Sequence, residues 1–212
     1  MLIIANVTIF LVLWLSDFLL LKNVPSLDSA VWDFGMIPRS IMRGERLYTV
    51  FTSMFLHADF IHLGGNMLFL YVFGDNVEDA FGHGRYLAFY LLSGIVASIV
   101  YLVSVIYSGD WRALYSPTIG ASGAIAGVLG AYIVMYPRAR ILTLVLIGWM
   151  YIVPIPAIFF LGLWFVYQML YGMLALGLEV VTGVAYWAHI GGFVAGIFFG
   201  LIWRGRRRIR PI

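Results

Sequence analysis

Residues 85–107 read RYLAFYLLSGIVASIVYLVSVIY, a predominantly apolar run whose single charge, Arg85, stands at its start. A helix that crosses a bilayer needs about 20 mainly apolar residues, so this run predicts a transmembrane helix. The whole chain has the same character: of its 212 residues 63% are hydrophobic and 11% are charged, and the mean hydropathy is +0.97. A soluble domain is about half apolar and about a quarter charged. The composition therefore excludes an ordinary soluble domain and predicts a membrane protein.

Further apolar segments lie on both sides of this run. Together they predict an all-α membrane protein, a six-transmembrane-helix bundle with a long outer loop between its first two helices. The expected spans are residues 2–21, 60–75, 85–107, 121–136, 154–178 and 186–203, in one domain that covers residues 1–212 and ends in a basic cytoplasmic tail, residues 204–212. The first span lacks the basic start and the cleavage site of a signal peptide, so we expect it to be retained.

Residues 141–153 are the ambiguous segment of the chain. They are apolar but few for a transmembrane helix, and Pro154 and Pro156 follow them. We expect an interfacial segment on the cytoplasmic side that leads into the fifth span. A seventh span or a re-entrant piece is the alternative, and it would invert the topology of everything that follows.

The basic residues predict the orientation in the membrane. Cytoplasmic loops of membrane proteins are enriched in Lys and Arg. The arginine cluster of the tail, with an even number of spans, places both termini of a multi-pass cell-membrane protein in the cytoplasm. Four basic residues of the first loop then lie outside, so the bias is incomplete. We assign the net charge of +3 to this orientation and expect no nucleic-acid partner.

Polar side chains within spans are costly, so they are candidates for function. With six spans, the second, fourth and sixth helices all enter the membrane from its outer face. His62, Asn66, Ser122 and His189 fall within the first turns of these three helices. Four polar side chains are therefore expected at one depth, just below the outer surface.

Ser122 and His189 suggest nucleophilic catalysis. A serine hydroxyl needs a nearby base to become a good nucleophile, and the ordinary pKa of histidine suits that role. Small residues allow two helices to approach closely, which would bring the two side chains within hydrogen-bond distance. The small residues that form these faces include Gly123 and Gly127 on the fourth span and Gly192 and Gly196 on the sixth. Asp17 lies near the outer end of the first span, and no Asp or Glu is embedded in the membrane as a third member, so we predict a dyad. A structural serine and a core histidine are the alternatives.

His62 and Asn66 are four residues apart and share one helix face. They could stabilise the oxyanion that forms when a hydroxyl attacks an amide, together with a backbone N–H near Ser122. Hydrogen bonding between packed helices is the alternative. His57 lies close by in sequence, but five residues would place it about 140° around a helix from His62, and the metal motif H-E-x-x-H is absent. The chain has no cysteine, and we expect no metal and no cofactor.

Three motifs resemble those of the rhomboid intramembrane serine proteases: Gly120-Ala-Ser122-Gly123, Ala188-His189-Ile190-Gly191-Gly192 and His62-x-x-x-Asn66. The resemblance extends from Leu47 to Trp203. It implies a bundle of six helices in which Ser122 is the nucleophile and His189 the general base. It further implies an oxyanion hole from Asn66, His62 and the backbone at Gly120, and a cytoplasmic-side Glu78 that helps hold helices together. The fifth span and residues 179–185 would form the lateral gate.

The sequence departs from some members of that family at two points. Where they have a Trp-Arg pair in the first loop, this chain has Leu47-Tyr48-Thr49. Where they have a tyrosine that stacks on the histidine, one turn after the serine, it has Ala126. We expect Tyr186 or Trp187 to supply the missing contact.

The predicted function is therefore that of an intramembrane serine endopeptidase whose partners are transmembrane protein substrates and the lipid bilayer. A rhomboid-like pseudoenzyme that binds such proteins without cutting them is one alternative, and the intact pair Ser122 and His189 disfavours it. A small channel or transporter is another. The sequence has no internal repeat of useful strength and no charged residue at mid-membrane depth, which disfavours that class.

Overall fold

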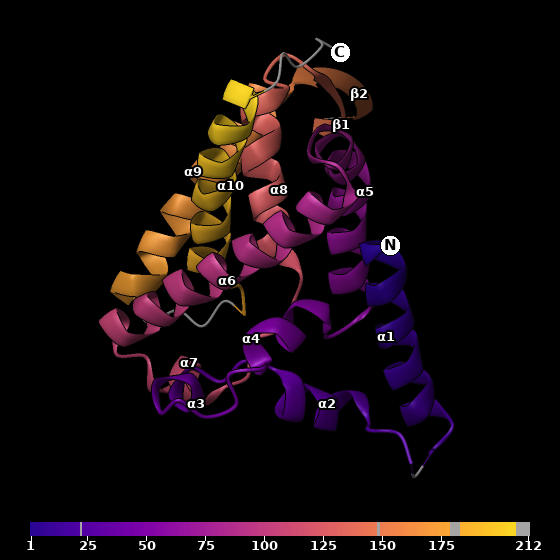
Figure 1. The fold of residues 1–212 in the computed structure, drawn as a ribbon, viewed down its shortest axis with the longest axis vertical. Coiled ribbons are helices and arrows are strands. Elements are labelled where there is room, and N and C mark those ends of the chain that lie inside the picture. Colours follow the sequence, from indigo (N-terminus) through magenta and orange to yellow (C-terminus); the bar gives the residue numbers. More distant parts are fainter. Residues whose placement is uncertain (22, 148, 179–182, 207–212) are drawn as a thin grey trace.

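The computed structural model describes residues 1–21, 23–147, 149–178 and 183–206 (Figure 1). In chain order the elements are α1 (Leu2–Phe18), α2 (Leu27–Phe34), α3 (Pro38–Met42), α4 (Thr49–Thr52), η1 (Ser53–Phe55), α5 (Phe60–Phe81), α6 (His83–Ser108), α7 (Trp111–Tyr115), α8 (Ser122–Met135), β1 (Arg140–Ile147), β2 (Trp149–Pro156), α9 (Ala157–Leu178) and α10 (Tyr186–Arg206). Residues 179–182 of the predicted gate loop and 207–212 of the predicted tail lie outside the described residues.

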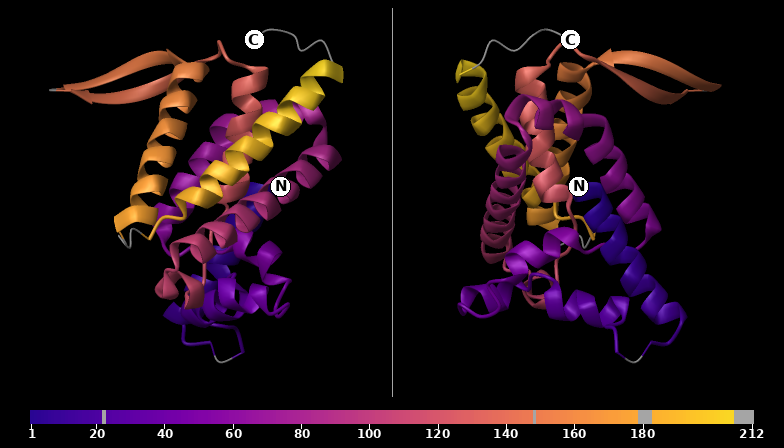
Figure 2. Two further views of the ribbon diagram at one scale, coloured as in Figure 1. Left: turned by 90° about the vertical axis from the view of Figure 1, so that its left-hand side faces the viewer. Right: turned by 45° about the vertical axis from the view of Figure 1, so that its right-hand side comes forward.

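Helix α8 is the centre of the molecule. Its sequence, SGAIAGVLGAYIVM, is rich in small residues, and nearly every residue is buried. Helices α5, α6, α9 and α10 pack around it (Figures 1 and 2). Side chains at the start of α8 are therefore enclosed by the surrounding helices.

Helix α10 packs on α8 with almost no side chain between the two backbones. A methyl group added at Gly192 would collide with the carbonyl oxygen of Gly123, and one at Gly196 with that of Gly127. On the side of α6, a Cβ at Gly123 would lie 2.7 Å from the Cβ of Ala97. The two glycine faces identified in the sequence thus lie against each other.

Helices occupy the positions of all six predicted spans, but their bounds differ. Helix α1 ends at Phe18 rather than 21, just before Leu20 adopts a positive φ of 54°. Helix α5 continues to Phe81 rather than 75, and Gly82, with φ of 81°, separates it from α6. Among the described residues, α6, α9 and α10 are long and apolar enough to cross a membrane, while α1 and α8 are shorter apolar helices.

Helix α1 is shifted along the long axis of the molecule. Figure 1 shows its first residues beside the middle of α5 and its last residues at the end where α2, α3 and α7 lie. Phe10 and Trp14 pack edge-on against Phe60, the first residue of α5, with ring centroids 4.9 and 5.3 Å away. The second half of α1 therefore packs at the level of the loop helices.

The segment predicted to be interfacial is an antiparallel β-hairpin. Strands β1 and β2 pair in register from Arg140 with Pro156 to Ile147 with Trp149. The alternative of a seventh transmembrane helix is wrong, because a lone pair of strands leaves backbone groups at its edges unpaired and cannot cross hydrocarbon. The hairpin also takes Pro154 and Pro156 out of the predicted fifth span, so α9 begins at Ala157. Figure 2 shows the hairpin projecting sideways from the helices.

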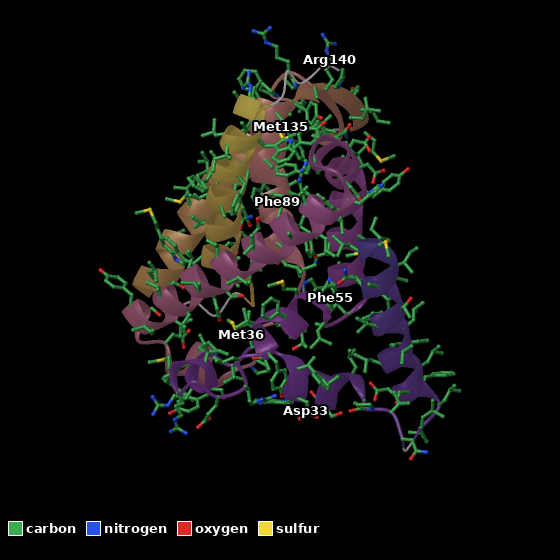
Figure 3. All side chains as sticks on the ribbon, in the orientation of Figure 1. Asp33, Met36, Phe55, Phe89, Met135 and Arg140 are labelled. Atoms are coloured by element: carbon green, nitrogen blue, oxygen red, sulfur yellow. The ribbon has the colours of Figure 1, made fainter. Side chains whose placement is uncertain are left out.

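The segment between α1 and α5 folds into the short helices α2, α3, α4 and η1 at the end of the molecule opposite the hairpin. Figure 3 shows Asp33 and Met36 at this end and Met135 and Arg140 at the other. Its turns are fixed by side chains that bind backbone: an Arg46 guanidinium N–H donates to the carbonyls of Trp32 and Asp33, and the Tyr48 hydroxyl donates to Asp33 at 3.2 Å. In this chain Arg46 and Tyr48 thus fix the first loop.

Candidate active site

Ser122 is the first residue of α8, and the segment before it is fixed by the first loop. The backbone of Met36 pairs with that of Thr118, with N–H to O distances of 3.0 and 2.8 Å. The N–H of Gly120 donates to the carbonyl of Ser53 at 2.9 Å. Three loop contacts therefore hold the chain at the point where α8 begins. The first N–H groups of a helix have no partner within it, so those at the start of α8 are candidates to bind a group next to Ser122.

Ser122 and His189 are hydrogen-bonded. His189 lies in the first turn of α10, and its Nε2 is 2.8 Å from the Ser122 Oγ. The contact between Gly123 and Gly192, one residue after Ser122 and three after His189, holds the two helix backbones at this separation. The geometry is that of a nucleophile next to a general base.

The other ring nitrogen of His189 binds a residue that the sequence analysis missed. Its Nδ1 is 2.8 Å from Oε1 of Gln168, on α9, and only 5% of Gln168 is exposed. The signal was present in the sequence, because Gln168 is the one amide or charged side chain between residues 157 and 178. The site is thus a chain of three side chains from α8, α10 and α9.

The expected aromatic contact to His189 comes from a different residue. The ring of Trp164, one turn before Gln168 on α9, is 6.0 Å from the imidazole between centroids. The prediction of Tyr186 or Trp187 was wrong. The Trp187 indole donates instead to the carbonyl of Gly172 at 3.0 Å, and Tyr186 packs against Tyr171. Both residues precede His189 and contact the second half of α9, at Tyr171 and Gly172.

His62 lies close to Gly120 and Ser122. A Cβ at Gly120, where φ is +123°, would be 2.8 Å from His62 Nε2 and 3.7 Å from Ser122 Oγ. The Nδ1 of His62 accepts the N–H of Ala58 at 3.3 Å, so in the neutral ring Nε2 carries the proton. The missing side chain of Gly120 therefore leaves space for His62 Nε2–H next to Ser122. The N–H of Gly120 itself is bound to the Ser53 carbonyl, so it is not the backbone donor that we expected.

A cavity of about 730 Å³ connects these side chains. Asn66, His62, Ser122, Gln168 and His189 all line it, and α5, α6, α8, α9 and α10 contribute to its walls. Asn66 is buried, and one N–H of its amide donates to the carbonyl of His62 at 3.1 Å. Cavities of roughly 300–1,000 Å³ hold small ligands or short peptide segments, so the site has room for a substrate and for water.

His57 lies next to this site but does not line the cavity. It is fully buried before the start of α5, with its ring 5.0 Å from that of His62, so the predicted separation of the two around one helix was wrong. Burial, and to a smaller degree the neighbouring His62, lowers the pKa of His57 to about 4. Within the described part of the chain, no group of three or more His, Cys, Asp and Glu side chains could hold a metal ion.

Glu78 lies far from the cavity, near the end of α5. Its Oε1 is 2.6 Å from Nδ1 of His83, the first residue of α6. Nearby, the Trp203 indole of α10 donates to the carbonyl of Ala80 at 2.8 Å. Glu78 therefore contacts the turn between two consecutive helices, next to a point where α10 is bonded to α5.

Comparison with known proteins gives the same family as the motifs. A model of the Rhomboid domain matches residues 44–206. The chain is 33% identical over 154 residues to Rhomboid protein 1, mitochondrial, of Saccharomyces cerevisiae, which is 72% of this chain and 40% of that protein. It is 30% identical over 190 residues to RHOMBOID-like protein 12, mitochondrial, of Arabidopsis thaliana, covering 82% of this chain and 52% of the relative.

A bacterial relative is named as a protease. The chain is 33% identical over 165 residues to Rhomboid protease GluP of Bacillus subtilis, covering 78% of this chain and 28% of that protein. The chain thus spans about half or less of the length of these three relatives. The domain match covers most of the chain and includes every residue of the site described above. The chain belongs to the rhomboid family.

Proposed function

We propose that this chain is an intramembrane serine endopeptidase that hydrolyses peptide bonds of transmembrane proteins near the outer membrane boundary. The observation that carries the proposal is the 2.8 Å hydrogen bond between Ser122 Oγ and His189 Nε2 in the wall of a large cavity. Membership of a family that includes a named protease supports it.

In the proposed reaction Ser122 attacks the carbonyl carbon of the scissile bond while its hydroxyl proton passes to Nε2 of His189. The C–N bond of the tetrahedral intermediate then breaks, and the imidazolium gives its proton to the leaving amine. A water molecule from the cavity then attacks the resulting ester while His189 takes its proton. The ester C–O bond breaks, the proton returns to Ser122 Oγ, and the new carboxyl terminus is released.

The negative oxygen of the intermediate needs donors that are in place before the reaction. We assign this role to the amide of Asn66, to Nε2–H of His62 and to the unpaired backbone N–H groups at the start of α8. A substrate helix shields its own amides by internal hydrogen bonds, so it must unwind locally to reach Ser122. Small or helix-breaking residues are therefore expected near the cut.

The topology is part of the proposal. The six long helices would all cross the membrane, with the loop helices α2–α4 outside and the β-hairpin and both termini in the cytoplasm of a cell-membrane protein. The absence of native cysteine makes this directly testable, because single cysteines can be introduced without removing others. A cysteine at Asp33 should react with an impermeant maleimide from outside, and one at Leu144 should react only after permeabilisation.

The test of the activity is cleavage of a single-span substrate by purified protein in liposomes. Wild type should cleave, and Ser122→Ala and His189→Ala should each abolish cleavage. Ser16→Ala is the matched control, since Ser16 is another buried serine in an apolar helix and its hydroxyl binds the carbonyl of Val24 outside the cavity. A wild type that binds several such substrates without cutting them would instead indicate a pseudoenzyme, and equal cleavage by all variants would remove Ser122 from the mechanism.

A further inference from the structure

We propose that Gln168 is a positioning residue for His189, so that α9 supplies the third member of the site and selects the form of the imidazole that can act as a base. The inference rests on the proposed function and adds to it a part that a two-residue site lacks. It is carried by the hydrogen bond between His189 Nδ1 and Gln168 Oε1 and by the burial of Gln168.

Gln168 is an unusual residue for its surroundings. Helix α9 is otherwise apolar or aromatic, and a buried amide in such a helix costs free energy unless it is hydrogen-bonded. Its Oε1 has one such bond, and its partner is the residue that also binds Ser122. The position of Gln168 is therefore explained by His189 rather than by packing.

The direction of this bond decides the chemistry. An amide oxygen can only accept, so Nδ1 of His189 carries the proton. In the neutral ring Nε2 is then unprotonated and accepts the hydroxyl proton of Ser122. The other tautomer would present an N–H to Ser122 and could not act as a base. A carboxylate orients the histidine of a serine triad in the same way, but a charge buried at this depth is expensive, whereas an amide orients without one.

Trp164 adds a second restraint from the same helix. It lies four residues before Gln168, so both side chains project from one face of α9. Its ring lies against the imidazole at a tilt of 35°, with the ring centroids 6.0 Å apart. Gln168 fixes the ring's hydrogen-bonding edge, and Trp164 limits its tilt.

The arrangement ties the base to the placement of α9 on α10. Phe165 stacks on Phe193 with centroids 4.7 Å apart, and the Trp187 indole binds the carbonyl of Gly172, on either side of Gln168 along α9. Displacing α9 at this level would break the bond to Nδ1. We therefore infer that α9 remains packed against α10 during the chemical step, whichever segment moves to let the substrate enter.

The experiment compares Gln168→Met with Gln168→Glu. Met has nearly the same length and suits an apolar helix, but it has no strong acceptor for Nδ1–H. Glu keeps an acceptor oxygen at the same place. We expect Gln168→Met to lower kcat by about 10- to 100-fold with KM nearly unchanged, and Gln168→Glu to retain most of the wild-type rate. A merely structural role gives the opposite order, because Met is the milder change in a membrane helix.

A second readout separates this inference from the proposed function. A fluorophosphonate reacts with an activated serine without any peptide substrate: the Ser122 Oγ–P bond forms, the P–F bond breaks, fluoride leaves and the hydroxyl proton passes to His189. Gln168→Met should be labelled about 10- to 100-fold more slowly than wild type, and Gln168→Glu at nearly the wild-type rate. Trp187→Phe, which removes a different hydrogen bond between α9 and α10, is the matched control and should be labelled faster than Gln168→Met.

Each outcome decides the matter. If wild type is labelled at Ser122 but Gln168→Met is labelled equally fast, the positioning role is wrong and the proposed function stands. If Gln168→Glu is slower than Gln168→Met, or Trp187→Phe is as slow as Gln168→Met, packing of α9 explains the effect and the inference fails. If wild type and Ser122→Ala give the same labelling, both the inference and the proposed function fail.

Discussion

Helix α10 is held on its two sides in opposite ways. Against α8 the contact is mainly between backbones, because glycines stand at the points where the two helices come closest. Against α9 it consists of large side chains, with Phe165 stacked on Phe193 and Trp187 bonded to Gly172. The first kind of contact fixes a distance, since backbones cannot yield, while the second can repack. We call the α8 side of α10 the rigid side and the α9 side the adjustable side. The distance between Ser122 and His189 depends on the rigid side, and the orientation of the His189 ring depends on the adjustable side.

The largest expected effect comes from adding a side chain to the rigid side. Gly192→Leu would drive its Cβ into the carbonyl oxygen of Gly123, where no side chain can move away. We expect loss of activity and destabilisation of more than about 3 kcal/mol, measured by cleavage and by unfolding in detergent. Gly162→Ala on α9 is the control, since its Cβ would meet nothing within 4 Å. A folded, active Gly192→Leu protein would show that the α8–α10 interface adjusts after all.

Next in size is the loss of Asn66, which we propose as an oxyanion donor. Asn66→Ala should lower kcat by about 10²- to 10³-fold and leave KM nearly unchanged, because the amide acts on a charge that exists only in the transition state. Steady-state cleavage of a model substrate measures both constants. A rise in KM alone would instead mean that Asn66 binds substrate in the ground state or only joins helices.

The same contrast explains what could be predicted from the sequence. Contacts built on glycine leave a regular pattern, so Gly123, Gly127, Gly192 and Gly196 indicated which helices meet and hence that Ser122 approaches His189. Side-chain contacts leave no spacing rule: neither the bond from Gln168 to His189 nor the contact from Trp164 follows from periodicity, because both depend on the rotation of α9. Short apolar runs do not separate helix from strand, so the sequence did not predict the hairpin at residues 140–156, and the fifth span was started three residues too early.

A smaller effect on the stability of the folded protein should appear when the pH falls. We expect it to arise at His57, in the loop that contacts the segment before α8. His57 follows η1, whose Ser53 carbonyl binds Gly120. Because burial lowers the pKa of His57 to about 4, the unfolded chain binds a proton below about 6.5 that the folded chain does not. Stability should be complete above pH 6.5 and fall toward pH 4, by at most about 1.4 kcal/mol per pH unit.

Chemical unfolding of wild type and His57→Leu at a series of pH values measures this contribution. The slope of stability against pH should be shallower in the variant between pH 4 and 6.5. The other three histidines are unchanged in this comparison, so a difference between the two slopes reports on His57. Equal slopes in wild type and His57→Leu would mean that His57 is protonated without cost in the folded protein.

The smallest expected effect is on the adjustable side and tests whether α9 acts through His189 or only through packing. Trp164→Phe shortens the ring that covers the imidazole, and an aromatic contact of this kind contributes about 0.5–1.5 kcal/mol, so kcat should fall by about 2- to 10-fold. Phe165→Leu removes a stacked ring of the same interface that touches Phe193 and not His189. If side chains on α9 tune the base, Trp164→Phe should lower kcat more than stability, and Phe165→Leu should lower stability more than kcat. Parallel losses in both variants would mean that the two sides of α10 differ in rigidity but not in function.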